Sequence, residues 1–308
     1  RRPLEMAEEV RQAARRGYRW LKYHIDEVHN VIDQTRAMQK VAPPGFRMHY
    51  DFNANSDDES ISPILQELGR FPVAGRIEDP IRTSDRAGYR KITAGSDLEI
   101  LVHHGPVNYL IDRGACDGYM AGHAPVGQAI MVAGVSEQAG LPFMLQQAGG
   151  QINQAFLAHE VAVFRGASID HVNLAHLWTD DVTTTRANVV DGTIPVPKGP
   201  GLGLELDQRK LDRYARAPRP KYRPFLVRIR YQGGPTIIVR HDAHRPGATD
   251  NLRFLGRLLK GQVKDGRIPG PKPGYNNAVR TDFLDAGNFG GFEDAWRRTA
   301  SGAIVVPG

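Results

Sequence analysis

The stretch RWLKYHID, residues 19–26, places a lysine and a histidine two positions apart, at Lys22 and His24. The stretch has the composition of a strand, and residues i and i+2 of a strand point to the same face. Two proton-carrying side chains are therefore expected to project side by side. Such a pair can abstract or donate a proton, but the same residues can also form a charged strand edge without a chemical role.

Ionisable residues recur after Lys22 at a regular interval, at Asp51, Glu78 and His104. The interval is about 26 to 29 residues, and each residue stands at the end of a predicted strand. One parallel βα unit takes roughly 30 residues. A (β/α)8 barrel builds its active site from the C-terminal ends of its strands. The spacing therefore predicts that these side chains gather at one mouth of a barrel.

The elements between these positions alternate between strand and helix. Strand-like runs include YRWLKYHI, FRMHYDFN, VAGRIED, LEILVHH, CDGYMA and LPFMLQQ. The helical stretches between them often end at a glycine, which is typical of a helix C-cap. This alternation indicates an α/β fold with parallel strands. Because the glycine-rich first turn of a doubly wound sheet is missing from the sequence, a TIM-type barrel is predicted.

Composition limits the classes of partner. The chain has 308 residues and a net charge of +6, which favours anionic ligands, including acidic metabolites. Its basic residues are scattered without aromatic neighbours, so we expect no nucleic acid partner. No apolar run approaches the length of a membrane span, so we expect no membrane association. A single cysteine, Cys116, excludes an internal disulfide and favours a reducing, cytoplasmic location.

Five segments, in their order and spacing, resemble the barrel domain of the enolase superfamily, in its mandelate racemase and muconate lactonizing enzyme branch. They are GYRWLKYHI, HYDFNAN, RIEDPI, AGLP and DGTIPVPKGPGLGLELD. The resemblance implies a modified (β/α)7β barrel over residues 1–214. The sequence opens in the helix that should follow the first barrel strand. We therefore expect seven parallel strands, with the first strand and the family's N-terminal cap missing.

Residues 215–308 differ in character and are predicted to be a C-terminal extension. The run FLVRIRYQGGPTIIVRHD alternates apolar and polar residues around Gly-Gly-Pro, which predicts a β-hairpin. The run TDNLRFLGRLLKG predicts an amphipathic helix.

The resemblance implies abstraction of the proton α to a carboxylate, with a divalent metal, usually magnesium, stabilising the enediolate. Its typical substrates are small carboxylates, such as hydroxy acids and sugar acids. Asp51, Glu78 and His104 stand at the three metal-ligand positions. Histidine is a poor magnesium ligand and a good ligand of manganese, iron and zinc, so these metals stay open. A shift of one residue would make His103 the inward-facing group.

The resemblance also assigns roles around the metal. Lys22 and His24 stand where the family carries its base and a carboxylate-binding partner. The residues expected to contact substrate are Asn53, His103, His123 and Gln146. Racemases of the family carry a histidine near Gln146, so its absence favours one-base chemistry, such as dehydration of a sugar acid. A racemase or epimerase and a non-catalytic barrel that binds a small anion are the alternatives, and a homo-oligomer is left open.

Overall fold

The computed structural model describes residues 3–25, 31–54, 56–103, 105–112, 114–122, 126–218, 224–231, 234–241 and 279–307. The chain divides into two compact units. Arg1–His24 and Ile32–Pro218 form the first, and Ile25–Val31 and Arg219–Gly308 form the second.

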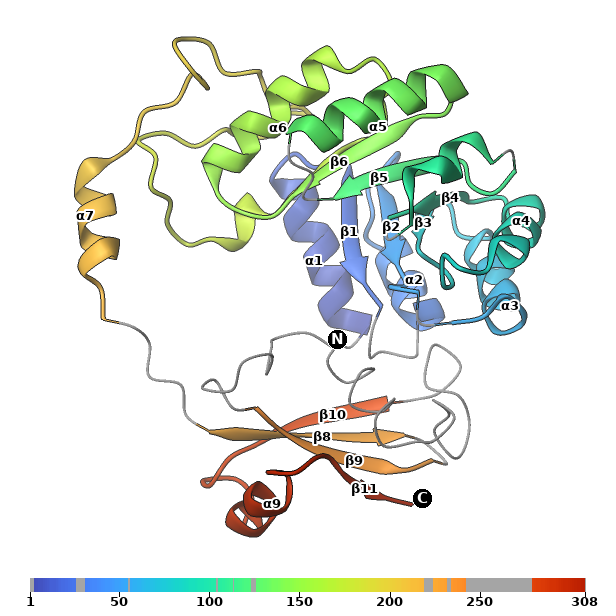
Figure 1. Ribbon diagram of the computed structural model, residues 1–308, viewed down its shortest axis with the longest axis vertical. Helices are drawn as coiled ribbons and strands as arrows, with labels where there is room; N and C mark the ends of the chain where they lie inside the picture. The colour runs from blue at the N-terminus through green and yellow to red at the C-terminus, as the bar shows by residue number, and fades with distance from the viewer. Residues whose placement is uncertain are drawn as a thin grey trace. The chain divides into compact units, whose positions relative to one another are not determined.

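Helices and strands alternate along the first unit, as predicted (Figure 1). The elements up to the middle of the sheet are α1 (Pro3–Arg15), β1 (Trp20–His24), α2 (Val31–Gln39), β2 (Arg47–Asp51), α3 (Asp58–Leu68), β3 (Ala74–Glu78), α4 (Arg86–Gly95) and β4 (Glu99–Val102). The remaining elements are the 3-10 helix η1 (Val107–Ile111), β5 (Gly118–Gly122), α5 (Val126–Ala139), β6 (Phe143–Gln147), α6 (Gln151–Val163), β7 (Val172–Asn173), η2 (Ala175–Leu177) and α7 (Gln208–Arg216).

Within the described residues, β1 to β7 pair in chain order as one parallel sheet, which confirms the predicted barrel of seven parallel strands. Successive side chains of each strand point to opposite faces of the sheet. On one face, Tyr50, Ile77 and Phe143 are fully buried. The side chains on the other face meet inside the barrel, where the Lys22 Nζ of β1 donates a hydrogen bond to Gln146 Oε1 of β6.

The interior on the β4–β6 side is apolar. Leu101, Met120, Met144 and Ile169 form one buried cluster, against which Val172 packs.

The gap between β7 and β1 is bordered by a loop rather than closed by strand pairing in the described part of the chain. The amide of Gly192 donates to the carbonyl of Gly17 at 2.6 Å, just before β1 begins. Gly17 has a φ of +84°, and a Cβ there would lie 2.8 Å from the carbonyl oxygen of Val189. A glycine is therefore needed for this loop to approach the strand.

The second unit holds an antiparallel sheet in the order β10-β8-β9-β11. Its elements are β8 (Phe225–Tyr231), β9 (Thr236–His241), β10 (Val279–Leu284), α9 (Phe292–Arg298) and β11 (Ile304–Val306). Strands β8 and β9 form the predicted hairpin. Helix α9 packs on the sheet through Phe292 and Ala295, which cluster with Leu226 and Leu284. The amphipathic helix predicted over 249–261 lies outside the described residues.

None of the helices within the described ranges has the length and apolar character that crossing a membrane requires.

Candidate active site

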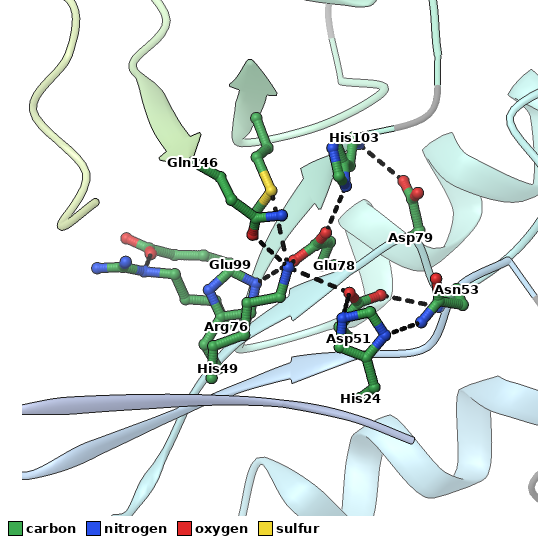
Figure 2. Close-up of polar contacts among 12 residues, drawn as sticks. His24, His49, Asp51, Asn53, Arg76, Glu78, Asp79, Glu99, His103 and Gln146 are labelled. Carbon is green, nitrogen blue, oxygen red and sulfur yellow. Dashed lines mark hydrogen bonds and ion pairs between the residues drawn. The ribbon is translucent and has the colours of Figure 1, made fainter. Parts of the chain in front are cut away.

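Three neighbouring strands end in a row of polar side chains. In the register of the sheet His24 pairs with Asp51, and Asp51 pairs with Glu78. Parallel strands present their carboxyl ends at the same edge, so the three side chains meet at one mouth of the barrel (Figure 2). The sequence spacing predicted this gathering for Asp51 and Glu78.

Lys22 reaches into this row from one layer below. Its Nζ lies 2.7 Å from Glu78 Oε2 and 3.1 Å from Asp51 Oδ2, and it donates to Gln146 Oε1 at 2.7 Å. The Lys22 side chain is 6% exposed, and those of Asp51 and Glu78 are 1% and 0% exposed. Two buried carboxylates therefore share one buried ammonium.

The electrostatics of the trio follow from that geometry. Burial alone lowers the pKa of Lys22, but the charges of Glu78 and Asp51 raise it above its ordinary value. Burial alone raises the pKa of Glu78, but the Lys22 charge and the neighbouring imidazoles bring it well below its usual range. Burial and the charge of Glu78 raise the pKa of Asp51 to about 6. At neutral pH Lys22 thus carries its proton and Glu78 is ionised.

His24 stands at the rim of the mouth. Its Nε2 lies 3.2 Å from Asp51 Oδ2, and its Nδ1 lies 2.6 Å from the side-chain nitrogen Nδ2 of Asn53. The backbone amide of Asn53 donates to Asp51 Oδ1 at 2.9 Å, and Asn53 adopts a left-handed φ of 49°. The His24 side chain is 55% exposed. His24 therefore faces solvent, whereas Lys22 on the same strand is enclosed.

His103 points toward the carboxylate of Glu78. Its Nδ1 lies 2.8 Å from Glu78 Oε1, and its backbone amide donates to Asp79 Oδ1 at 2.8 Å. A Cβ at Gly122, the last residue of β5, would overlap with His103 Nε2. The imidazole thus occupies the space that a β5 side chain would need. His104, expected as the third metal ligand, and His123 lie outside the described residues.

His49 belongs to the cluster, although the strand-end spacing did not point to it. Its Nε2 lies 2.7 Å from Glu78 Oε2, and the residue is 2% exposed. Burial lowers the pKa of His49 to about 4, so it is neutral at pH 7. The sequence feature that could have identified His49 is its position two residues before Asp51, because strand residues two apart share a face.

Arg76 stands two residues before Glu78 on β3, as His49 stands two residues before Asp51 on β2. It lies in the lower part of the barrel. Its guanidinium lies 3.6 Å from the centre of the Trp20 ring. It donates to Glu99 Oε2 at 3.0 Å and to Asp170 Oδ2 at 2.9 Å. These contacts compensate its charge at the end of the strands opposite the mouth.

The buried carboxylates fit two ligands of a divalent cation. Asp51 Oδ2 and Glu78 Oε2 make ion-pair contacts but no hydrogen bond of good geometry within the described ranges, and both lie close to Lys22 Nζ. Carboxylate oxygens of this kind are the ligands that hard cations such as magnesium prefer. The described residues hold no group of three or more His, Cys, Asp and Glu arranged for a metal. A third protein ligand is therefore not defined by this part of the chain.

Comparison with known proteins agrees with the fold and the order of these residues. A family model described as Enolase C-terminal domain-like matches residues 5–210. The chain is 26% identical over 232 residues to muconate cycloisomerase 1-2 of Acinetobacter lwoffii, covering 71% of this chain and 59% of that protein. It is 24% identical over 227 residues to o-succinylbenzoate synthase of Geobacillus stearothermophilus, covering 68% of this chain and 58% of that protein.

A solved structure shows the same fold. The dipeptide epimerase of Cytophaga hutchinsonii, crystallised with magnesium and the dipeptide D-Ala-L-Val, superposes with a TM-score of 0.61 at 18% identity, covering 68% of this chain and 60% of that one. The chain thus spans less than two thirds of the length of each of these relatives. It belongs to the enolase superfamily, with a barrel domain of the mandelate racemase and muconate lactonizing enzyme type.

Proposed function

We propose that this barrel abstracts the proton α to the carboxylate of a small organic acid, and that Lys22 carries the proton. The observation that supports the proposal most is the buried ammonium of Lys22, held by Asp51 and Glu78 at the mouth of an enolase-type barrel. Burial alone lowers the pKa of this lysine, but the charges of Glu78 and Asp51 raise it above its ordinary value, so Lys22 holds its proton while both carboxylates are ionised. A cation bound to these carboxylates would cancel their charge and lower the pKa of Lys22.

The reaction needs positive charge next to the substrate, because removing a proton α to a carboxylate creates a second negative charge. Lys22 brings one positive charge to the site. A divalent cation, magnesium by family and manganese, iron or zinc as alternatives, would be held by Asp51 and Glu78 and would supply further fixed positive charge. His24 and Asn53, at the rim beside Asp51, are placed to contact the substrate carboxylate.

The group opposite Lys22 bears on the outcome of the reaction. Gln146 of β6 receives the hydrogen bond from Lys22, and its neutral amide does not act as a base. A proton carrier on one face of the carbon supports one-base chemistry, such as dehydration of a sugar acid or another hydroxy acid. Racemisation or epimerisation, which requires a second proton carrier on the opposite face, is the less favoured outcome.

The test uses the full 308-residue chain in deuterated water with a panel of hydroxy acids and sugar acids, with and without Mg²⁺ or Mn²⁺. Proton NMR follows loss of the α-proton signal and the formation of a keto acid or an epimer. We expect metal-dependent exchange together with a dehydrated keto acid. An epimer in place of the keto acid would favour the alternative reaction. Binding of the acids without exchange or product would contradict catalysis and leave an anion-binding barrel.

A further inference from the structure

The carboxylate of Glu78 is held from both sides by imidazoles. His49 comes from β2, and His103 directly follows β4. These are the two strands that flank β3. His103 Nδ1 lies 2.8 Å from Oε1, and His49 Nε2 lies 2.7 Å from Oε2. The oxygen that His49 contacts is also the one that lies 2.7 Å from Lys22 Nζ.

His49 occupies a layer between two cations. In the register of the sheet it pairs with Lys22 on one side and with Arg76 on the other. A neutral imidazole separates these charges. Its Nε2 lies 2.7 Å from Glu78 Oε2, and neither atom has a hydrogen bond of good geometry within the described residues, so this carboxylate oxygen is the acceptor within reach of a proton on Nε2. The arrangement matches the donor of His49 to the acceptor of Glu78.

Simple filling of the barrel does not account for a histidine at this depth. The interior of β5 and β6 is filled by Met120 and Met144, whose thioether sulfurs are at most weak hydrogen-bond acceptors. A buried imidazole has to be compensated by a partner, whereas a methionine does not. His49 is also 2% exposed, and its side chain contacts the buried carboxylate of Glu78.

We propose that His49 is a positioning residue, which donates its Nε2–H to Glu78 Oε2 and keeps that carboxylate turned toward the Lys22 ammonium. For catalysis this inference rests on the proposed function, because its effect on rate is exerted through Lys22. Its effect on the orientation of Glu78 does not depend on any activity. The two consequences can therefore be measured separately.

Three variants test the proposal by kinetics. His49→Leu removes the donor at similar volume, and His49→Gln restores an N–H near the position of Nε2. His171→Leu is the matched control, because it removes a half-buried imidazole whose ring contacts Gln154. For α-proton exchange we expect kcat to fall about tenfold or more in His49→Leu, with KM changed less than about threefold. His49→Gln should recover most of kcat, and His171→Leu should keep it.

Crystal structures of the wild type and the His49 variants supply the readout that is independent of activity. The 2.7 Å contact between Glu78 Oε2 and Lys22 Nζ should persist in His49→Gln and open beyond about 4 Å in His49→Leu. If His49→Leu does not fold, His49→Asn serves instead, since its amide is too short to reach Glu78.

Two results would overturn the proposal. One is an unchanged Glu78 position and an unchanged kcat in the variant without a donor. The other is a His49→Gln protein as slow as His49→Leu. If the wild type exchanges no α-proton at all, the proposed function fails, and the crystal structures still decide whether His49 positions Glu78.

Discussion

The inside of the barrel has a charged half and an apolar half, built on strands of the same sheet. The charged half comprises Lys22, Asp51, Arg76 and Glu78 on β1 to β3, together with the neutral imidazole of His49. The apolar half comprises Leu101, Met120, Met144 and Ile169. Both halves are buried, yet burying charges carries a desolvation cost that apolar side chains avoid. The apolar half shows that this fold can fill its interior without that cost, so the charged half points to a chemical role rather than to stability.

The largest predicted effect on stability comes from breaking the charged half at its centre. Lys22→Met leaves Asp51 and Glu78 buried without their shared cation. We expect the free energy of unfolding at pH 7 to fall by about 3–5 kcal/mol, the usual cost of removing one partner of a buried ion pair. Denaturant titration followed by circular dichroism measures it. A variant as stable as the wild type would show that the two carboxylates are already compensated by other groups.

The second prediction concerns pH and the neutral state of His49. Its pKa is about 4 in the folded protein, against an ordinary value of 6.5, because it is buried and flanked by Lys22 and Arg76. Between these values the unfolded chain binds a proton that the folded chain does not. The free energy of unfolding therefore falls as pH decreases from 6.5 to 4, by up to about 3 kcal/mol.

The His49→Gln variant isolates this effect. It lacks the titrating imidazole but keeps Asp51, whose raised pKa of about 6 acts in the opposite direction over much of the same range. The difference in unfolding free energy between wild type and variant should therefore shrink as the pH is lowered. A difference that stays constant from pH 7 to pH 4 would mean that His49 titrates normally in the folded protein.

A third prediction probes the border between the halves, where β5 ends. Gly122→Ala introduces a Cβ that overlaps with His103 Nε2 and must displace the imidazole from Glu78. We expect a loss of about 1–3 kcal/mol in unfolding free energy. Gly134→Ala in α5 is the matched control, because its Cβ meets nothing within 4 Å. That change should stabilise the protein by about 0.4–1 kcal/mol. Equal effects of the two substitutions would argue against a tight fit of His103.

The smallest effect is expected in the apolar half. Met120→Leu conserves volume and character, so it should cost less than about 1.5 kcal/mol of unfolding free energy. It should leave the rate of α-proton exchange within about threefold of wild type, although the Met120 sulfur lies 3.8 Å from Lys22 Nζ. A large loss of rate with little loss of stability would extend the functional region into the apolar half.

The barrel and the upper part of its charged half could be predicted from the sequence, because ionisable residues recur at a steady interval at the strand ends. That interval predicts that Lys22, Asp51 and Glu78 gather at one mouth of the barrel. The lower layer, with His49 and Arg76, was missed because attention to strand ends overlooks residues one pleat deeper. The same period of two that places Lys22 below His24 would have found both.

The fourth strand could not be assigned to the residue by the same reasoning. The sequence pointed first to His104 as the inward residue, with His103 as the alternative. In the structure His103 contacts Glu78, and His104 lies outside the described residues. Which of two adjacent residues faces inward depends on where pairing stops. Strand β4 ends at Val102, and the backbone amide of His103 is drawn to Asp79. That contact joins residues 24 positions apart and has no local sequence signal.

The central claim is that Lys22 in the charged half carries the substrate proton. The most direct measurement compares α-proton exchange into deuterated water by the wild type, Lys22→Met and His24→Asn, each with divalent metal and each normalised to its folded fraction. The account predicts that Lys22→Met lowers the exchange rate by about 10²–10⁴-fold, as expected for loss of a general base, while His24→Asn retains a measurable rate. Exchange by Lys22→Met at the wild-type rate would contradict it.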